Sequence, residues 1–245
     1  MNTNGSVPPQ SPNANLRYII RRRAELVQRS LLFSEVSLED RERIVALARE
    51  VHFKEGKTIF LAGDSVREVI LLTSGCIKLS QFGPQGTEVI LRLVGPGEAL
   101  CIKCFPECTH CSTAQAVDPS SALVWEAGQF EAVRDRFPTL GRNVSCVLLQ
   151  TLNHLEVRFR ETSTEKVATR LSSQLVRLVN QVGKPFNGYV EIALSQRDLA
   201  QLTGTTLFTV SRLLGDWEDQ GIVRTKREAV EVLDVPALMN LSRIE

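Results

Sequence analysis

Four cysteines lie close together near the middle of the chain, at Cys101, Cys104, Cys108 and Cys111. Their spacing is C-x2-C-x3-C-x2-C, so four of the six thiols of the chain fall on one short stretch. Thiolates are ligands of zinc and of iron–sulfur clusters, and thiols this close in sequence can converge on one centre. The pattern therefore predicts a metal centre on this loop, held by the four cysteines.

Other interpretations of the same loop stay open. His110 lies inside the cluster and could replace one cysteine as a ligand. Without a metal, the two C-x2-C pairs could form disulfides on oxidation and act as a redox switch. A thiol oxidoreductase is less well supported, because such enzymes place C-x-x-C at the start of a helix after a strand. We find no phosphate-binding glycine loop and no convincing triad, so we expect no enzyme. Cys76 and Cys146 are expected to be packing residues.

A second stretch with chemical meaning runs from Ser195 to Gly221 and reads as a helix-turn-helix. Ser195 and Asp198 form a capping box that starts the first helix, and Gly204 provides the turn. Thr205 or Thr206 is expected to cap the second helix. The core-facing positions of that helix follow at helical spacing, at Val210, Leu213, Leu214 and Trp217. A helical hairpin packed into a core is the competing interpretation.

The opposite face of the second helix would enter the DNA major groove at its N-terminal end. The predicted DNA-contacting residues on it are Thr205, Thr206, Phe208, Thr209, Ser211 and Arg212. Two short alternating runs follow Gly221 and predict a β-hairpin with Arg224, Lys226 and Arg227 at its tip. A basic hairpin beside such a helix suits phosphate contacts and favours a DNA-binding wing over a solvated turn.

Composition limits the class of protein without selecting the function. The 245 residues carry a net charge of +1, so overall charge gives no indication of nucleic-acid binding. No apolar run approaches the roughly 20 residues that span a bilayer, and the N-terminus lacks the apolar segment of a secretory signal. We therefore expect a cytoplasmic protein with no membrane partner, whose thiols are reduced or metal-bound.

The elements that position these two stretches follow from periodicity. Residues 1–15 are expected to be disordered, and residues 16–137 combine helices with short strands and glycine turns, typical of a small antiparallel barrel. A long helix follows over 138–161, and a capping box at Thr162 and Glu165 is expected to begin the C-terminal domain, 162–245. One apolar stripe on the long helix predicts a parallel dimer through Val144, Leu148, Thr151, Leu155 and Phe159.

Together these segments resemble the Crp/Fnr family of bacterial transcription regulators, from Leu31 to Val235. The resemblance rests on FKEGKTIFLAGD, TSGCIKL, the GPGE turn, TVSRLL and WEDQGIV taken together. It implies an α+β fold: an antiparallel β-roll like a cyclic-nucleotide-binding domain, a dimerisation helix and a winged helix-turn-helix. It further implies a homodimer on a pseudo-palindromic double-stranded DNA site, with RNA polymerase as a partner.

The sequence departs from the family pattern at two places. Many relatives carry Glu where this chain has Phe208, which can offer a base only apolar contact. Cyclic-nucleotide-binding relatives hold the phosphate with an arginine after the Gly-Glu turn, yet no arginine occurs between Arg92 and Arg134. We therefore expect no cyclic nucleotide. An iron–sulfur cluster sensing redox state, oxygen or nitric oxide is favoured over zinc, because zinc is redox-inert.

Overall fold

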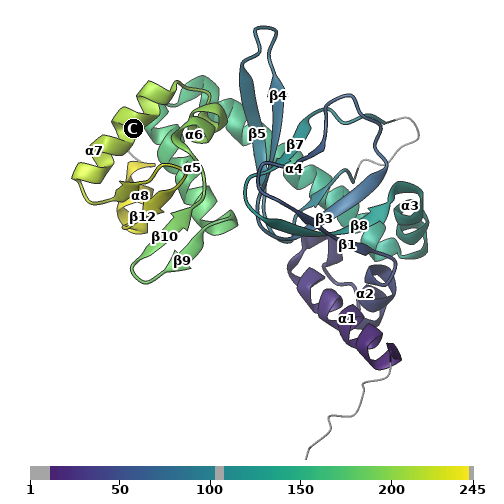
Figure 1. The fold of residues 1–245 in the computed structure, drawn as a ribbon. Helices are drawn as coiled ribbons and strands as arrows, with labels where there is room; N and C mark the ends of the chain where they lie inside the picture. The colour runs from purple at the N-terminus through teal and green to yellow at the C-terminus, as the bar shows by residue number, and fades with distance from the viewer. Residues whose placement is uncertain (1–11, 103–107, 243–245) are drawn as a thin grey trace, which may run out of the picture.

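Two antiparallel four-stranded sheets form the N-terminal half of the computed structural model, which describes residues 12–102 and 108–242 (Figure 1). Their strand orders are β1-β8-β3-β6 and β2-β7-β4-β5. The strands are β1 (Arg49–Phe53), β2 (Thr58–Phe60), β3 (Glu68–Ser74), β4 (Ile77–Phe82), β5 (Glu88–Val94), β6 (Ala99–Leu100), β7 (Thr113–Ala116) and β8 (Ser120–Glu126). The predicted β-roll is confirmed.

The roll closes because alternate strand residues of both sheets point inward. Leu72 and Val124 from one sheet and Ile77 and Val94 from the other belong to one buried cluster. Gly75 makes the tight turn between β3 and β4 with φ of +87°. A Cβ there would lie 2.3 Å from Ser120 Oγ and 2.6 Å from its Cα, so only glycine fits this turn.

Helices cover one end of the roll around a buried tryptophan. They are α1 (Pro12–Leu26), α2 (Leu38–Val45) and α3 (Ala127–Arg136), with short 3-10 turns at Val27–Arg29 and Leu31–Phe33. The Trp125 ring packs against Phe33 and Phe130, and its Nε1 donates to the Ile44 carbonyl at 3.0 Å. Because α1 begins at Pro12, the predicted disordered tail over residues 1–15 extends too far; residues 1–11 lie outside the described part.

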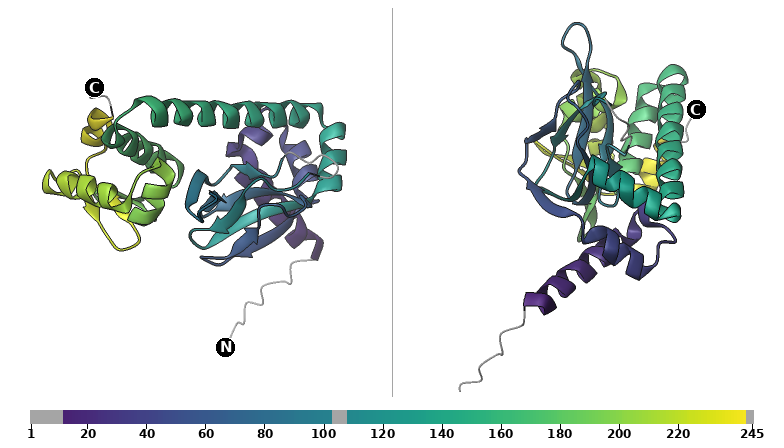
Figure 2. Two further views of the ribbon diagram at one scale, coloured as in Figure 1. Left: turned by 90° about the horizontal axis from the view of Figure 1, so that it is seen from above. Right: turned by 90° about the vertical axis from the view of Figure 1, so that its right-hand side faces the viewer.

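A long helix, α4 (Pro138–Thr164), runs along one side of the roll and continues to the C-terminal part of the chain (Figure 2). The predicted capping box at Thr162 and Glu165 is wrong. Thr162 lies inside α4, and the Glu165 amide donates to the Glu161 carbonyl at 2.9 Å, which completes the last turn. The next helix, α5 (Val167–Gln181), starts after Lys166 without a side-chain cap.

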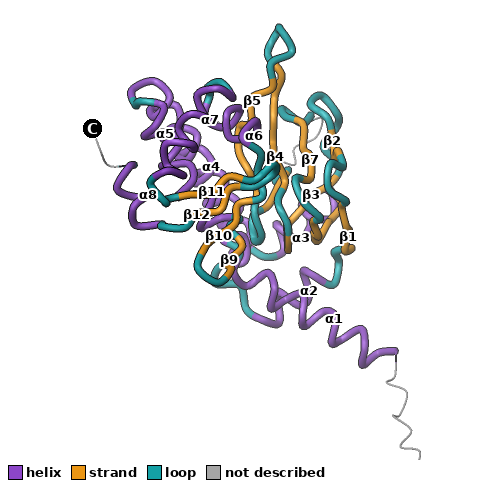
Figure 3. The backbone as a smooth tube through the Cα atoms, turned by 60° about the vertical axis from the view of Figure 1, so that its left-hand side comes forward, coloured by secondary structure: helices purple, strands orange, loops and turns teal. Residues whose placement is uncertain are grey.

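The C-terminal part packs helices against a small sheet of order β11-β12-β10-β9 (Figure 3). Its elements are α5, β9 (Lys184–Phe186), β10 (Tyr189–Ile192), α6 (Gln196–Thr203), α7 (Leu207–Asp219), β11 (Val223–Thr225), β12 (Val230–Val232) and α8 (Val235–Leu241). The expected α+β class is confirmed. Asp234 caps α8, with its carboxylate accepting from Ala237 N at 2.9 Å.

Candidate nucleic-acid interface and sensor loop

Helices α6 and α7 form the predicted helix-turn-helix. The Ser195 hydroxyl accepts from Asp198 N at 3.1 Å while the Asp198 carboxylate accepts from Ser195 N at 3.2 Å, a complete capping box. Gly204 ends α6 in the left-handed region with φ of 64°. Thr206 then caps α7 by accepting from Thr209 N at 3.2 Å. Local hydrogen bonds therefore fix where the second helix begins and how it leaves the turn.

The outer face of α7 is exposed over its first two turns. Val210, Leu213 and Trp217 are buried, which turns Phe208, Ser211 and Arg212 toward solvent. Phe208 is 79% exposed, although exposure of a large aromatic ring is unfavourable in water. Its neighbour Leu207, which the sequence analysis did not single out, is also exposed.

The hairpin of β11 and β12 follows α7 as a wing, but its basic residues differ in their surroundings. Arg224 lies on strand β11 rather than at the tip, and its Nη1 contacts the Glu231 carboxylate at 3.0 Å. Lys226 also pairs with Glu231, which is only 1% exposed, and this bond lowers the pKa of the Glu231 carboxyl. Arg227 is fully exposed at the tip and, among the described residues, its ion-pair contact is with its neighbour Glu228, at 3.8 Å. The prediction that all three basic side chains lie at the tip of the hairpin is therefore wrong for Arg224, which lies within β11.

The stripe predicted as a dimer seam on α4 is divided between two environments. Val144 is 7% exposed and Leu148 is half-buried, and both pack against the cluster around Trp125. Thr151 accepts a hydrogen bond from Arg92 of β5 at 3.1 Å. Val144 is therefore covered by the chain's own core and unavailable to a partner chain, whereas Leu148 and Thr151 are only partly covered.

A neighbouring set of α4 side chains remains exposed and apolar. We call it the α4 stripe: Leu149, Leu152, Leu155 and Phe159, of which Leu149 is 60% and Phe159 77% exposed. Two of these, Leu155 and Phe159, belong to the predicted seam, and the other two were missed. Leu149 and Leu152 could have been found from the spacing of three, three and four residues that they form with Leu155 and Phe159.

The cysteine loop begins at Cys101, directly after β6. Cys101 takes a φ of 61°, which is uncommon for a residue with a Cβ. Its Sγ lies 3.6 Å from His110 Nδ1, and the His110 ring stacks on Phe60 with centroids 3.6 Å apart. Burial lowers the pKa of His110, which favours the neutral imidazole that binds metals. The pair thus holds a sulfur and a ring nitrogen side by side.

The far end of the loop is tied to the turn before β3. Val66 N donates to the Cys108 carbonyl at 2.9 Å, and His110 N donates to the Asp64 carbonyl at 2.8 Å. Cys111 is exposed, and Cys104 falls outside the described residues. Within the described ranges, no three His, Cys, Asp or Glu side chains converge on a point. Of the predicted four-cysteine site, the structure therefore places the Cys101–His110 pair and no complete ligand set.

The two other cysteines occupy different settings. Cys76 is buried directly before β4, and burial raises the pKa of its thiol to about 12, so it stays a protonated thiol. Cys146 is exposed on α4.

Family models match both halves of this architecture. A cyclic nucleotide-binding domain matches residues 50–137, and a Crp-like helix-turn-helix domain matches residues 169–241. The chain belongs to the Crp/Fnr family. Its relatives include the cyclic AMP receptor protein of Thermus thermophilus, 27% identical over 87% of this chain and 97% of that protein. The nitrogen fixation regulation protein FixK of Bradyrhizobium diazoefficiens is 24% identical over 85% of this chain and 88% of its own length.

Solved structures agree on the fold. FixK2 from Bradyrhizobium japonicum superposes with a TM-score of 0.71 at 20% identity, covering 81% of this chain and 98% of that one. This Crp/Fnr chain is accordingly a DNA-binding transcription regulator. None of the helices in the described part is long and apolar enough to cross a membrane.

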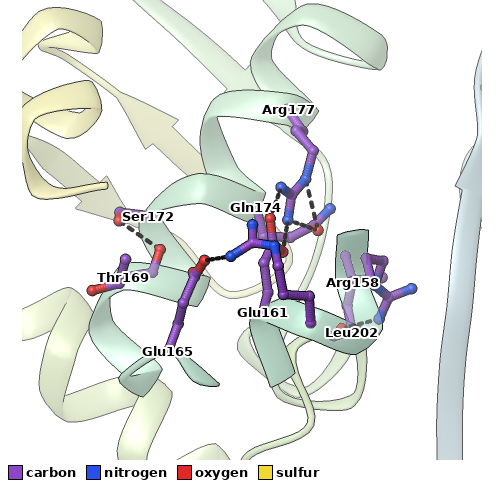
Figure 4. Close-up of polar contacts among 9 residues, drawn as sticks. Arg158, Glu161, Glu165, Thr169, Ser172, Gln174, Arg177 and Leu202 are labelled. Atoms are coloured by element: carbon purple, nitrogen blue, oxygen red, sulfur yellow. Dashed lines mark hydrogen bonds and ion pairs between the residues drawn. The ribbon is translucent and has the colours of Figure 1, made fainter. Parts of the chain in front are cut away.

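In this family member, polar contacts link α4 to the DNA-binding domain (Figure 4). Arg177 of α5 contacts the Glu161 carboxylate through two bonds of 2.7 and 2.8 Å, and also reaches the Gln174 side chain at 3.0 Å. Arg158 donates to the carbonyls of Leu91 in the roll and Leu202 in α6. Sequence reasoning missed both arginines, because each bonds to residues far away in the sequence.

Arg177→Met is expected to lower the free energy of unfolding by about 2–3 kcal/mol, because it leaves the buried Glu161 carboxylate without its partner. Denaturant unfolding measures this. Arg142→Met is the matched control, since Arg142 and its partner Glu35 are both exposed and their ion pair should contribute little. Equal losses for the two variants would show that the Glu161 pair does not hold α4 to α5.

Proposed function

We propose that this Crp/Fnr regulator binds a pseudo-palindromic duplex as a homodimer, with the start of α7 in the major groove of each half-site. The supporting observation is that the first two turns of α7 are exposed. They directly follow the turn at Gly204 and the helix cap at Thr206. Thr209, Ser211 and Arg212 offer hydroxyls and a guanidinium there, groups that hydrogen-bond to base edges and phosphates.

The base preference of this regulator should differ from that of relatives with Glu at the matching position. Phe208 and Leu207 present apolar surface where a carboxylate would accept from cytosine N4. Apolar side chains in the major groove favour the thymine methyl group. We infer half-sites with thymine at the positions nearest the start of α7.

Arg212→Ala is expected to weaken specific DNA binding by about 1–3 kcal/mol, the usual contribution of a bidentate guanine contact. Arg212 is exposed, and its ion pair among the described residues is a 3.6 Å contact with Asp216. Breaking that exposed contact when DNA binds should cost little. Fluorescence anisotropy on specific and random duplexes measures the effect. An equal loss on both duplexes would instead make Arg212 a phosphate contact.

Phosphate contacts from the wing should come chiefly from Arg227. Arg224 already pairs with the Glu231 carboxylate at 3.0 Å. Lys226 also pairs with Glu231 and lies 3.7 Å from the Glu191 carboxylate. In the part of the chain that the structure describes, no buried carboxylate pairs with Arg227. We propose that Arg227 contacts the backbone directly, while Arg224 and Lys226 contribute after exchanging partners.

The α4 stripe is proposed as the dimer interface. Four large apolar side chains on one helix edge are poorly accommodated in water, and burying them against the same edge of a second copy removes that cost. Because α4 leads straight into the DNA-binding domain, a parallel pairing would place the two α7 helices side by side. Interaction with RNA polymerase is proposed from the family resemblance alone.

The signal is proposed to act through a metal or iron–sulfur centre on the cysteine loop. Two ligands of one tetrahedral zinc, with bonds of about 2.3 Å to sulfur and about 2.0 Å to nitrogen, lie about 3.5 Å apart. The 3.6 Å between Cys101 Sγ and His110 Nδ1 fits that separation. Two of the three other cysteines, Cys104, Cys108 and Cys111, would supply the remaining ligands, with His110 in place of the fourth cysteine, and an iron–sulfur cluster would add redox sensitivity. We propose no cyclic nucleotide as the signal and no enzymatic activity.

Anaerobic purification followed by iron, sulfide and zinc analysis tests the proposed centre. Iron with equimolar sulfide supports a cluster, and zinc alone supports a structural site. Metal-free protein whose DNA affinity responds to a thiol oxidant would support the disulfide switch instead.

A further inference from the structure

A cavity of about 450 Å³ lies where the roll, α4 and the DNA-binding domain meet. We call it the interdomain cavity. Its apolar walls come from Leu91 and Leu93 of β5, Leu155 and Val157 of α4, and Leu202 of α6. A volume of this size is in the range that holds a small organic ligand. Exposed His154 and Leu155 mark its mouth.

Three arginines also line the interdomain cavity, one from each surrounding part of the chain: Arg92, Arg158 and Arg177. Arg177 is neutralised by Glu161. Arg158 donates to carbonyl oxygens of Ile90, at 3.3 Å, and of Leu91 and Leu202. Among the described residues, neither Arg158 nor Arg92 has a carboxylate within ion-pair distance, so both line the cavity without forming an ion pair.

One carboxylate in the described lining offsets one of these two charges, so the lining keeps a net positive charge. Glu98 is the one carboxylate in the described lining, and its Oε2 already accepts from Gly95 N at 2.6 Å and from Gln181 Nε2 at 2.7 Å. Arg92 uses Nη1 on Thr151, while its buried Nε has no hydrogen-bond partner in the described part. Because this Nε is covered, an anion in the cavity would bind Arg92 through its terminal nitrogens, where charge-assisted hydrogen bonds are strong.

We propose that the interdomain cavity binds an organic anion that has one carboxylate and an apolar body. The carboxylate accepts from Arg92, and the apolar body lies against Leu93, Leu155 and Leu202. A ligand so placed touches the roll, α4 and α6 at once, and therefore stabilises this arrangement of the domains over others. The effect on DNA affinity rests on the proposed function, whereas binding in the cavity does not.

Calorimetric titration of the full-length protein with hexanoate, octanoate and phenylacetate tests the binding. At least one of these should bind saturably, and its uncharged amide of the same shape should bind about tenfold more weakly or not at all. The comparison of acid with amide needs no variant, so it stands even if a substitution impairs folding. No saturable binding by any of the three acids, or equal binding of acid and amide, would overturn the proposal.

Two substitutions test whether the ligand binds in the interdomain cavity. Arg92→Gln should weaken binding of the best acid about tenfold, whereas Arg142→Gln should leave it unchanged, because Arg142 is an exposed arginine at the other end of α4. Unchanged binding by Arg92→Gln contradicts the assignment. If the ligand binds through Arg92 but DNA affinity does not change, the proposed site stands and its proposed coupling to DNA binding is wrong.

Discussion

Sedimentation of the Leu152→Glu variant is expected to show a monomer at concentrations where the wild-type protein is dimeric. Leu152 is exposed in the single chain, so a glutamate there should not disturb the fold. In the proposed dimer the same carboxylate would be buried against a second α4 stripe, where an unpaired charge is strongly unfavourable. Specific DNA affinity should fall with dimerisation, by two or more orders of magnitude, because only one half-site can be bound at a time.

The matched control is Gln150→Glu, which adds the same charge at an exposed α4 position facing away from the α4 stripe. It should remain dimeric and bind DNA normally. Leu148→Glu is a poorer test, because Leu148 packs against the chain's own core and its loss would destabilise the roll. If Leu152→Glu stays dimeric, the interface lies elsewhere.

If the proposed metal centre exists, Cys108→Ser is expected to remove its metal and to change DNA affinity by about fivefold or more, the usual range of coupling between sites. Cys108 is fixed to the turn before β3 through its carbonyl, so a ligand at this position constrains that end of the loop. Coupling is reciprocal, so duplex DNA should in turn change metal retention. Metal analysis and DNA titration of the same samples measure both effects.

Cys146→Ser serves as the control, because Cys146 is exposed on α4, outside the loop. It should keep both the metal and the DNA affinity of the wild type. If the metal-loaded protein, the metal-free protein and Cys108→Ser all bind DNA equally, the loop is structural and the signal enters elsewhere. The assignment as a DNA-binding regulator is independent of that outcome.

Features determined by neighbouring residues were predictable from the sequence. The Ser195–Asp198 capping box, the turn at Gly204 and the cap at Asp234 each depend on residues within a few positions of one another. The strands of the roll were likewise marked by alternation and glycine turns. Such signals do not need the tertiary structure, and the α+β architecture followed from them.

Features determined by distant contacts were not predictable. Periodicity placed Val144, Leu148 and Thr151 on one predicted seam of the long helix with Leu155 and Phe159, but it does not say which part of that seam the chain's own core covers. In the same way, the sequence suggests that Arg224 and Lys226 are unpaired basic residues. In the structure both form ion pairs with Glu231 of the neighbouring strand β12. The Thr162 box failed because α4 continues through it.

Selection of bound sequences from a random duplex library by the anaerobically purified protein tests the central claim most directly. The account predicts enrichment of a two-fold symmetric site whose half-sites are centred about one helical turn, roughly 10 base pairs, apart. Thymines should occur opposite the start of α7, where Phe208 is exposed. Failure to enrich any sequence, with the protein metal-loaded, metal-free, reduced or oxidised, would contradict it.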